Sequence, residues 1–444
     1  MQKLKRFAGL AAAAVIAIGG LAACSGDSNS SADNGKGKVY YLNFKPEQDE
    51  AWKKIAKAYT EETGTNVKIV TAASGTYEQT LKTEIDKAEA PTLFNINGPV
   101  GYQNWKGYVA DLKGTEFAGL LGNPDLAVTE GDGVYGVPFV VEGYGIIYND
   151  ALLQKYIATS GAKIKSADEI KNFATLKAVA EDIQAKKDEL GIKGAFASTS
   201  FAPGEDWRWQ THLANLPVFF ELRDKNEKDT ANLEFKYDQE YKALLDLYVN
   251  NSTVPPAQTS AKTVSDSMAE FAMGEAVFVQ NGNWAWGQIN EVPGNTVKAE
   301  DVHFLPMYTG VSGEEKQGIS VGTENFMSLN SQASEADQKA SLDFMVWLFS
   351  SDAGKKFVKE DLGFISPFKT FGENDVPNDP LGKEVAAFAN NADLYNVDWN
   401  FVIFPSQDFK DGFGQELSQY VAGNRDWENV KKYVVEQWAA EKGN

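Results

Sequence analysis

The sequence predicts an α/β protein with more than one domain. From residue 39 onward, segments rich in β-forming residues alternate with amphipathic helical segments, an order typical of parallel sheets wrapped by helices. The chain has 444 residues, of which 43% are apolar and 12% aromatic. At about 150 residues per domain, this length predicts two or three domains with large cores, and the composition excludes a disordered chain.

The first elements follow in strand and helix order. Residues 39–44 (VYYLNF) predict a strand, and residues 47–63 predict a helix that Gly64 ends. The order continues with a strand at 66–71, a helix through Tyr77, Leu81 and Ile85, and a strand at 92–97.

The next segments extend the α/β pattern to the second half of the chain. Residues 136–149 are β-rich throughout and exceed an ordinary strand of about five or six residues, so we expect them to cross between two domains. Capping-box patterns at Ser166 and Ser334 predict a helix over 166–189 and another from residue 334. Because no repeat and no Pro/Gly-rich linker separates the halves, short strands are expected to join the domains.

Charge and composition exclude several classes of function. The chain carries 62 acidic and 42 basic residues, and its formal charge of -20 repels phosphate backbones and anionic membrane surfaces. A nucleic-acid partner is therefore not expected. Cys24 is the only cysteine, and His212 and His303 are the only histidines, so no Cys/His metal site and no cofactor are predicted.

The N-terminal segment predicts export and anchoring. Basic residues at positions 3, 5 and 6 precede an uncharged run over residues 7–23, which is the layout of a signal peptide, with a transmembrane anchor as the weaker alternative. Residues 21–24 (LAAC) resemble the lipobox of bacterial lipoproteins. This resemblance implies that residues 1–23 are removed and that Cys24 carries lipid (palmitate). Residues 24–37 would form the lipidated cysteine and a flexible tether at the extracellular face of the cell membrane.

Motifs for catalysis are weak. Residues 131–136 (GDGVYG) match G-x-G-x-x-G, but a β-rich run with Pro138 follows in place of a helix, which favours a turn over a dinucleotide site. His212 and His303 each lie in a predicted regular element, so structural roles are favoured over catalytic ones. A carboxylate pair for glycoside hydrolysis stays open among 62 acidic residues. No catalytic residue is predicted.

Three stretches resemble the bacterial extracellular solute-binding proteins of carbohydrate ABC importers, the maltose-binding-protein-like family. Residues 131–150 (GDGVYGVPFVVEGYGIIYND) resemble its turn and crossover strand. Residues 270–287 (EFAMGEAVFVQNGNWAWG) resemble its helix-to-strand step and Trp-bearing turn, and residues 318–367 resemble the Gly-rich strand, helix and exit that follow. The stretches occur in the family's order, and the similarity extends from about residue 38 to 444.

The resemblance implies a two-lobed periplasmic-binding-protein-like fold of type II. Each lobe would be a mostly parallel sheet flanked by helices, and hinge strands would join the lobes. Lobe 1 is expected to comprise residues 38–142 and 309–363, and lobe 2 residues 143–308 and 364–444. A solute would bind between the lobes, at loops that follow strand ends.

A sugar needs aromatic rings against its C–H faces and polar side chains around its hydroxyls. The resemblance assigns a stacking role to Trp284, with core packing as the alternative and Trp286 as the core partner. It also implies that Glu142 contacts ligand. Asn95 and Asn97 stand where the family has an aromatic and an acidic ligand residue, so those two roles are absent, which argues against maltose itself. Their amides are expected to replace the acid as hydroxyl partners. The predicted ligand-binding set is Lys45, Glu47, Ser74, Asn95, Asn97, Glu142, Tyr144, Asp206, Trp207, Asn283, Trp284, Glu324 and Trp399.

The sequence therefore predicts a lipid-anchored, monomeric, non-enzymatic receptor. It would capture a carbohydrate, and an oligosaccharide is expected because several tryptophans can line an extended cleft. The resemblance implies that it passes this sugar to the permease subunits of an ABC importer. Two other functions stay open. An exported glycoside hydrolase would turn over a bound oligosaccharide, and a cell-surface polysaccharide adhesin would bind polymer without lobe closure.

Overall fold

The computed structural model describes residues 35–73, 75–198, 200–372 and 375–443. The expected signal peptide, Cys24, Ser74 and most of the expected tether lie outside these residues. Lys36–Asn444 form one unit of the chain. In the described ranges, no helix is long and apolar enough to cross a membrane.

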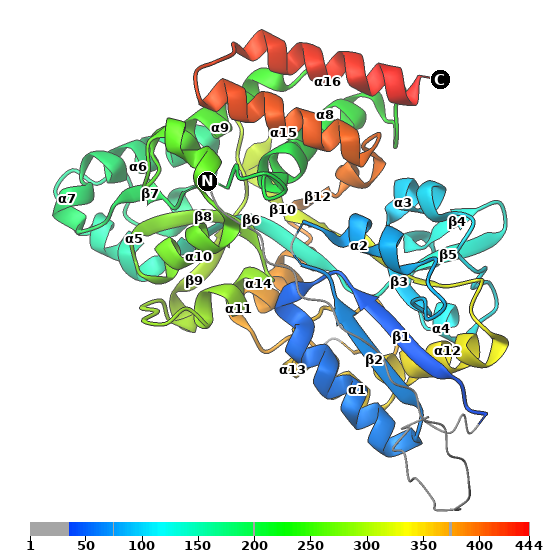
Figure 1. The fold of residues 1–444 in the computed structure, drawn as a ribbon. Coiled ribbons are helices and arrows are strands. Elements are labelled where there is room, and N and C mark those ends of the chain that lie inside the picture. The colour runs from blue at the N-terminus through cyan, green and yellow to red at the C-terminus, as the bar shows by residue number, and fades with distance from the viewer. Residues whose placement is uncertain (1–34, 74, 199, 373–374, 444) are drawn as a thin grey trace, which may run out of the picture. The chain divides into compact units, whose positions relative to one another are not determined.

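A first sheet of six strands carries packed side chains on both faces. Figure 1 shows its strands β1, β2 and β3 beside helix α1. Val39 and Tyr41 of its second strand face one core, and Leu42 faces the other, because successive side chains point to opposite faces of a strand. In spatial order the strands are β2 (Asn66–Thr71), β1 (Lys38–Asn43), β3 (Leu93–Asn97), β11 (Asn325–Leu329), β5 (Gly133–Pro138) and β4 (Val128–Glu130).

The helices of the first sheet bury apolar faces against these cores. The predicted first helix is confirmed, since Trp52, Ile55 and Tyr59 are buried and Gly64, with a φ of 75°, ends it in the left-handed conformation that glycine favours. The helices are α1 (Asp49–Thr63), α4 (Glu116–Gly119), α12 (Glu335–Ser350) and α13 (Asp352–Glu360) over one core, and α2 (Tyr77–Glu84) and α3 (Gly98–Trp105) over the other.

A second six-stranded sheet is also covered on both faces. Its path is β12 (Tyr395–Asp398), β10 (Gln317–Gly322), β6 (Glu142–Asn149), β8 (Ala276–Gly282) and β7 (Gly194–Phe196), with β9 (Val302–Leu305) also paired to β6.

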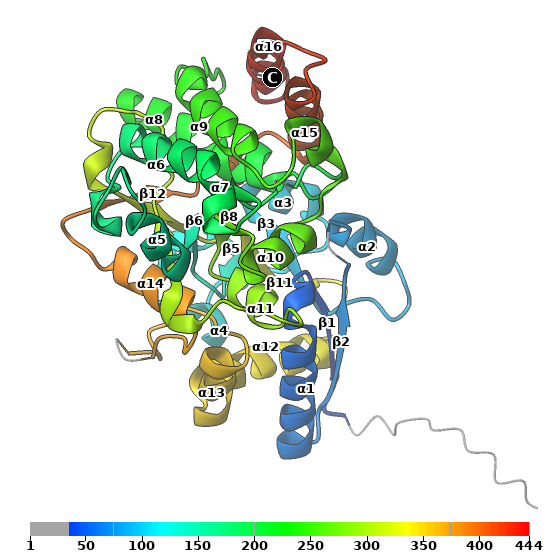
Figure 2. The ribbon, with the colours of Figure 1, turned by 90° about the vertical axis from the view of Figure 1, so that its left-hand side faces the viewer.

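Ten α-helices and a π-helical turn, η4 (Arg208–Leu213), accompany the second sheet in the described residues. Helices α15 and α16 pack side by side, as Figures 1 and 2 show. The ten are α5 (Asp150–Ile157), α6 (Phe173–Ala185), α7 (Lys187–Leu190), α8 (Asn215–Lys225), α9 (Asp238–Asn250), α10 (Val264–Ala272), α11 (Ala285–Asn290), α14 (Pro380–Ala389), α15 (Gln407–Val421) and α16 (Trp427–Lys442).

The predicted α/β class is confirmed, but the sheets are mixed rather than mostly parallel. In the first sheet only the β1–β2 and β1–β3 pairs are parallel, and in the second only β10–β12 and β7–β8. The other pairs are antiparallel. In the first sheet β11 runs against β3 and β5, and β4 and β5 form a hairpin. In the second sheet β6 runs against β8, β9 and β10.

The chain passes between the two sheets three times. Residues 139–141 lead from β5 to β6, residues 323–324 lead from β10 back to β11, and Ile365 forms a bridge with Val141 before α14 packs on the second sheet. The expected boundary at residue 308 differs from this arrangement, because β10 pairs with β6 and β12. A short Gly-containing strand carries no signal of which sheet it joins.

The predicted helix over 166–189 is interrupted. The Ser166 hydroxyl accepts from Asp168 N–H and caps only a short 3₁₀ turn, and α6 begins at Phe173 after the Asn172 side chain accepts from Thr175 N–H at 2.8 Å. At Ser334 the prediction is confirmed, since its hydroxyl accepts from Asp337 N–H at the start of α12. The two serines have similar local sequences, and only the second precedes a continuous apolar face.

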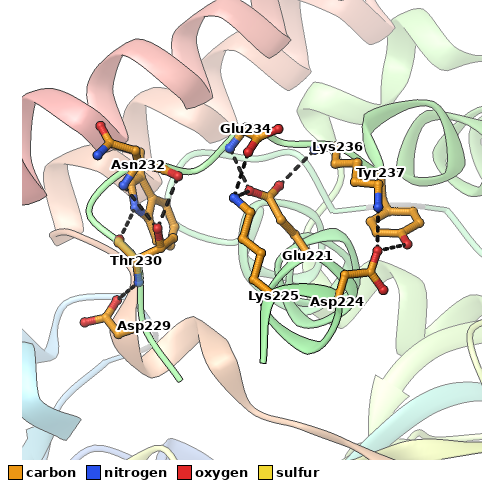
Figure 3. A network of polar contacts seen from close by, with 10 residues as sticks. Glu221, Asp224, Lys225, Asp229, Thr230, Asn232, Glu234, Lys236 and Tyr237 are labelled. Atoms are coloured by element: carbon orange, nitrogen blue, oxygen red, sulfur yellow. Dashed lines mark hydrogen bonds and ion pairs between the residues drawn. The ribbon is translucent and has the colours of Figure 1, made fainter. Parts of the chain in front are cut away.

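A buried carboxylate holds the segment between α8 and α9 (Figure 3). The Glu221 side chain is fully buried and accepts from the backbone N–H groups of Glu234 and Lys236 at 2.8 and 2.9 Å and from Lys225 at 2.8 Å. These contacts flank Phe235, which is buried and has a φ of 52°, an unusual value for a residue with a large side chain. Glu221 therefore fixes a strained turn.

Replacing Glu221 by alanine should lower the free energy of unfolding by about 2 kcal/mol, because two backbone N–H groups and Lys225 lose their acceptor. Chemical denaturation measures this loss, and hydrogen exchange should speed up at Glu234 and Lys236. Glu221→Gln is the control and should lose less, since its amide oxygen can still accept. Unchanged exchange in Glu221→Ala would contradict the assigned role.

Candidate functional site

A cavity of about 850 Å³ opens where loops of the two sheets meet. Its walls include the segments that follow β1, β2 and β3, the start of β6, the region 201–212, the turn after β8, the β10–β11 connection and α15. Such strand ends and crossing points are where open α/β sheets commonly bind ligands. The polar and aromatic lining includes Lys45, Glu47, Tyr77, Glu78, Asn97, Glu142, Asp206, Trp207, Gln210, His212, Trp284, Gln288, Glu324, Asn325, Trp399, Lys410, Asp411 and Arg425.

Three tryptophans supply the aromatic wall. The rings of Trp207 and Trp284 lie 6.1 Å apart between centroids, and the Lys45 ammonium group lies 5.5 Å from the Trp284 ring. Trp399 is 6% exposed and packs against Tyr144 at 5.3 Å, and its buried Nε1–H has no hydrogen-bond partner among the described residues. The wall thus offers flat apolar surfaces with a polar atom at their edge.

Lys45 centres one charged group of the cavity. Its Nζ lies 2.7 Å from Glu142 and 3.7 Å from Glu47, and the Lys45 and Glu142 side chains are each 7% exposed. Burial alone would lower the pKa of Lys45, but the carboxylates of Glu142 and Glu47 raise it above its usual value. Burial raises the pKa of Glu47. This lysine therefore neutralises carboxylates that would be costly to bury alone.

A second charged group surrounds Lys410 on α15. Burial lowers the pKa of Lys410 and raises those of Glu324 and Glu78, while it raises the pKa of Asp206 to about 6. The Asp206 carboxylate packs directly on α15, where a methyl group at Gly414 would lie 1.7 Å from its Oδ2. Glycine at this position is what lets α15 approach the cavity.

Amide groups add neutral hydrogen-bonding atoms to the lining. Asn97 Oδ1 and Gln288 Oε1 are buried and have no hydrogen-bond partner in the part of the chain that the structure describes. Because a buried polar atom without a partner is costly, such atoms in a cavity wall are suited to a ligand. Together with the tryptophans and carboxylates they fit a molecule that has apolar faces and a rim of hydroxyl groups.

Nine of the predicted site residues line this cavity. They are Lys45, Glu47, Asn97, Glu142, Asp206, Trp207, Trp284, Glu324 and Trp399. Ser74 lies outside the described residues.

Three predicted residues lie behind the cavity wall. Asn95 is fully buried and its Oδ1 accepts from the Tyr41 hydroxyl at 2.9 Å. Tyr144 stacks on His212 with centroids 3.9 Å apart and donates its hydroxyl to the His212 carbonyl. Asn283 Oδ1 accepts from Gly143 N–H at 3.0 Å, so it ties the β8–α11 turn to the start of β6. Their side chains make contacts within the fold, and the sequence resemblance carries no information on such contacts.

The contribution of α15 was missed by the sequence analysis. Gln407, Lys410, Asp411, Gly414 and Ser418 line the cavity from one face of this helix, at spacings of three and four residues. That polar spacing was the available signal. A separate apolar face, with Phe409, Phe413 and Leu417 buried in the core, has a similar spacing and explains the helix without a site.

The two histidines make structural contacts. His212 is stacked under Tyr144 and burial lowers its pKa well below the usual value, so its imidazole is neutral. His303 on β9 pairs with Glu384 of α14, which raises its pKa. Within the described ranges, no three His, Cys, Asp or Glu side chains are grouped to hold a metal ion.

Known proteins resemble the chain over most of its length. A model of the family described as bacterial extracellular solute-binding protein matches residues 54–384. The multiple sugar-binding protein of Streptococcus mutans serotype c is 25% identical over 382 residues, which cover 81% of this chain and 82% of that protein.

Two solved structures show the same fold. The SBP RafE in complex with raffinose has a TM-score of 0.68 at 18% identity, and the match covers 91% of this chain and 99% of that one. A chitin oligosaccharide binding protein has a TM-score of 0.66 at 16% identity, with the same two coverages. These likenesses show that the two sheets and their crossings form a known two-lobed α/β arrangement.

Proposed function

Because the chain belongs to the family of bacterial extracellular solute-binding proteins, we propose that it captures an oligosaccharide and delivers it to the membrane subunits of an ABC importer. The cavity carries this proposal, since three tryptophans and several carboxylates, amides and lysines from both sheets face one space. Aromatic rings suit the C–H faces of sugars, and the polar groups suit their hydroxyls.

The relatives and the size of the cavity support an oligosaccharide. The names of the similar proteins refer to multiple sugars, raffinose and chitin oligosaccharide. A cavity of about 850 Å³ is near the upper end of the range of roughly 300 to 1,000 Å³ for small-molecule sites. A chain of several sugar rings uses such a volume better than a single ring.

The proposed ligand contacts follow from the lining. Trp207, Trp284 and Trp399 would stack on or border sugar rings, and Lys45, Glu142 and the amides would bind hydroxyls. The three crossings at 139–141, 323–324 and near Ile365 would serve as hinges, with the parts of the chain that carry each sheet as the two lobes. The protein would act as a receptor and would release its sugar unchanged.

Binding to defined trisaccharides tests the function. We expect at least one of raffinose, maltotriose, xylotriose and triacetylchitotriose to raise the melting temperature, because a ligand at 100 times its Kd adds about 2.7 kcal/mol to the folded state. A tripeptide is the control and should have no effect. No response to any of the four sugars would contradict the proposal.

Two further readouts separate the alternatives. Small-angle scattering should show a smaller radius of gyration with bound sugar, since a ligand held between hinged lobes favours the closed state. An unchanged radius would favour the adhesin. Recovery of cleaved sugar after incubation would favour the hydrolase.

We also propose that Cys24 carries a lipid anchor. Cys24→Ser should move the exported protein almost completely from the membrane fraction to the medium, because a lipid chain supplies the binding to the bilayer. Fractionation followed by immunoblotting measures this, with Ser25→Ala as the control that should stay at the membrane. Equal membrane association of Cys24→Ser and the wild type would contradict the anchor.

A further inference from the structure

We propose that Lys410 and Glu324 form a subsite in which one sugar hydroxyl, or two neighbouring hydroxyls, bridges the ammonium group and the carboxylate. This inference rests on the proposed carbohydrate function and assigns Lys410 to it as a ligand-binding residue. The two side chains come from separate segments, α15 and the β10–β11 connection, and both line the cavity.

Lys410 is a buried cation whose hydrogen-bond donors are unused. Its residue is 6% exposed, and its Nζ makes no hydrogen bond or ion pair with any described residue. An ammonium group carries three N–H donors, and burying it without acceptors lowers the stability of the fold. By contrast, Lys45 in the same cavity contacts Glu142 at 2.7 Å. The unused donors of Lys410 are therefore available to a ligand.

Glu324 is the complementary acceptor. It lies in the two-residue connection between β10 and β11, and its carboxylate has no hydrogen-bond or ion-pair partner among the described residues. Among charged neighbours, Lys410 has the largest effect on Glu324, and Glu324 has the largest effect on Lys410. Each group is thus the other's main electrostatic partner, yet no direct contact joins them.

A hydroxyl group has the chemistry to bridge these two side chains. It donates its hydrogen to the Glu324 carboxylate and accepts from Lys410 through its oxygen, so both contacts are charge-assisted. An anionic group would face Glu78 and Asp411, which also act on Lys410. A protonated amine would leave Lys410 without an acceptor. The chemistry of the pair therefore favours a neutral, hydroxyl-bearing ligand.

Lys410→Met and Glu324→Gln test the subsite with the four trisaccharides. Calorimetric titration uses the trisaccharide that the wild type binds most tightly. Each variant should bind this sugar about 10- to 100-fold more weakly than the wild type, as expected for a lost charge-assisted hydrogen bond. The double variant should bind about as weakly as the weaker single variant, because both changes remove the same bridge. Lys432→Met, on the exposed face of α16, is the matched control and should bind like the wild type.

Stability without sugar gives a second readout that a structural lysine would not produce. Methionine matches lysine in length and carries no charge, so Lys410→Met should melt at the same temperature as the wild type or higher. A lower melting temperature, additive losses in the double variant, or losses below about 3-fold would overturn the subsite.

The outcomes separate this inference from the function on which it rests. Tight wild-type binding that both single variants retain overturns the subsite and leaves the proposed function standing. Failure of the wild type to bind any of the four trisaccharides contradicts the proposed function and, with it, the subsite.

Discussion

Replacing Trp284 by alanine should weaken trisaccharide binding by about 30- to 1,000-fold, which corresponds to the roughly 2 to 4 kcal/mol lost when an aromatic hot spot is removed. The Trp284 ring lines the cavity, lies 6.1 Å from the Trp207 ring and borders Lys45. The fold should tolerate this change better than the loss of Trp286, because the Trp284 ring borders the cavity and the Trp286 ring does not. Calorimetric titration beside thermal unfolding measures both effects.

The position of the ring depends on the glycine beneath it. A methyl group at Gly282 would lie 2.2 Å from atoms of the Trp284 ring, so the ring rests directly on the end of β8. Gly282→Ala should therefore displace the ring and weaken binding while Trp284 is still present. Its tryptophan fluorescence should change in the absence of sugar.

Trp286→Ala is the matched control for Trp284→Ala. Trp286 is half-buried against the core around α10 and is absent from the cavity lining. Its removal should lower the melting temperature and leave the affinity nearly unchanged, because it opens a cavity in the core rather than in the site. Intact affinity with a lower melting temperature in Trp284→Ala would instead assign Trp284 to the core.

Replacing Lys45 by methionine should lower the free energy of unfolding at pH 7 by about 3 to 5 kcal/mol, because Glu142 and Glu47 lose the cation that compensates their burial. Sugar binding should weaken as well, since Lys45 lines the cavity. Urea denaturation measures the stability. Lys57→Met, at an exposed position of α1, is the control and should change it by less than about 0.5 kcal/mol.

The stability loss caused by Lys45→Met should depend on pH, and the direction follows from the pKa of Glu47. Burial already raises the pKa of Glu47, and the loss of the ammonium group raises it further. A folded-state pKa above the unfolded value of about 4.3 means that stability falls as pH rises through the folded-state pKa. The deficit of the variant should therefore shrink as pH is lowered from 7 towards 5. A deficit that is constant over this range would indicate lost packing rather than unpaired charge.

Local sequence signals predicted individual helices and strands better than they predicted which strands pair with one another. The Ser334 cap and the apolar face of α1 each act within a few residues, so they are visible in the sequence. Which sheet accepts β10, and why β11 runs antiparallel, depends on pairings between segments far apart in the chain. Such pairings leave little trace in a single sequence.

The same contrast applies to the candidate site. Most predicted residues follow strands, and loops at the ends of strands in such sheets converge on one space. Tyr144 near the start of β6 and Asn283 just after β8 lie close to that space, but their side chains bind the His212 carbonyl and the Gly143 N–H, contacts that only the folded chain reveals. The sequence did not point to Lys410, because the apolar face of α15 is sufficient to account for the helix without a binding role.

The central position of β11 in the first sheet has a consequence for the order of folding. This strand lies between β3 and β5 and pairs Asn325 with Asn97, so the sheet stays incomplete until most of the chain has been synthesised. Contacts this distant in sequence must overcome a large loop-closure entropy and therefore form slowly. Until β11 arrives, β3 and β5 each keep one edge without the neighbour that the folded sheet supplies, so the first sheet becomes continuous only late in folding.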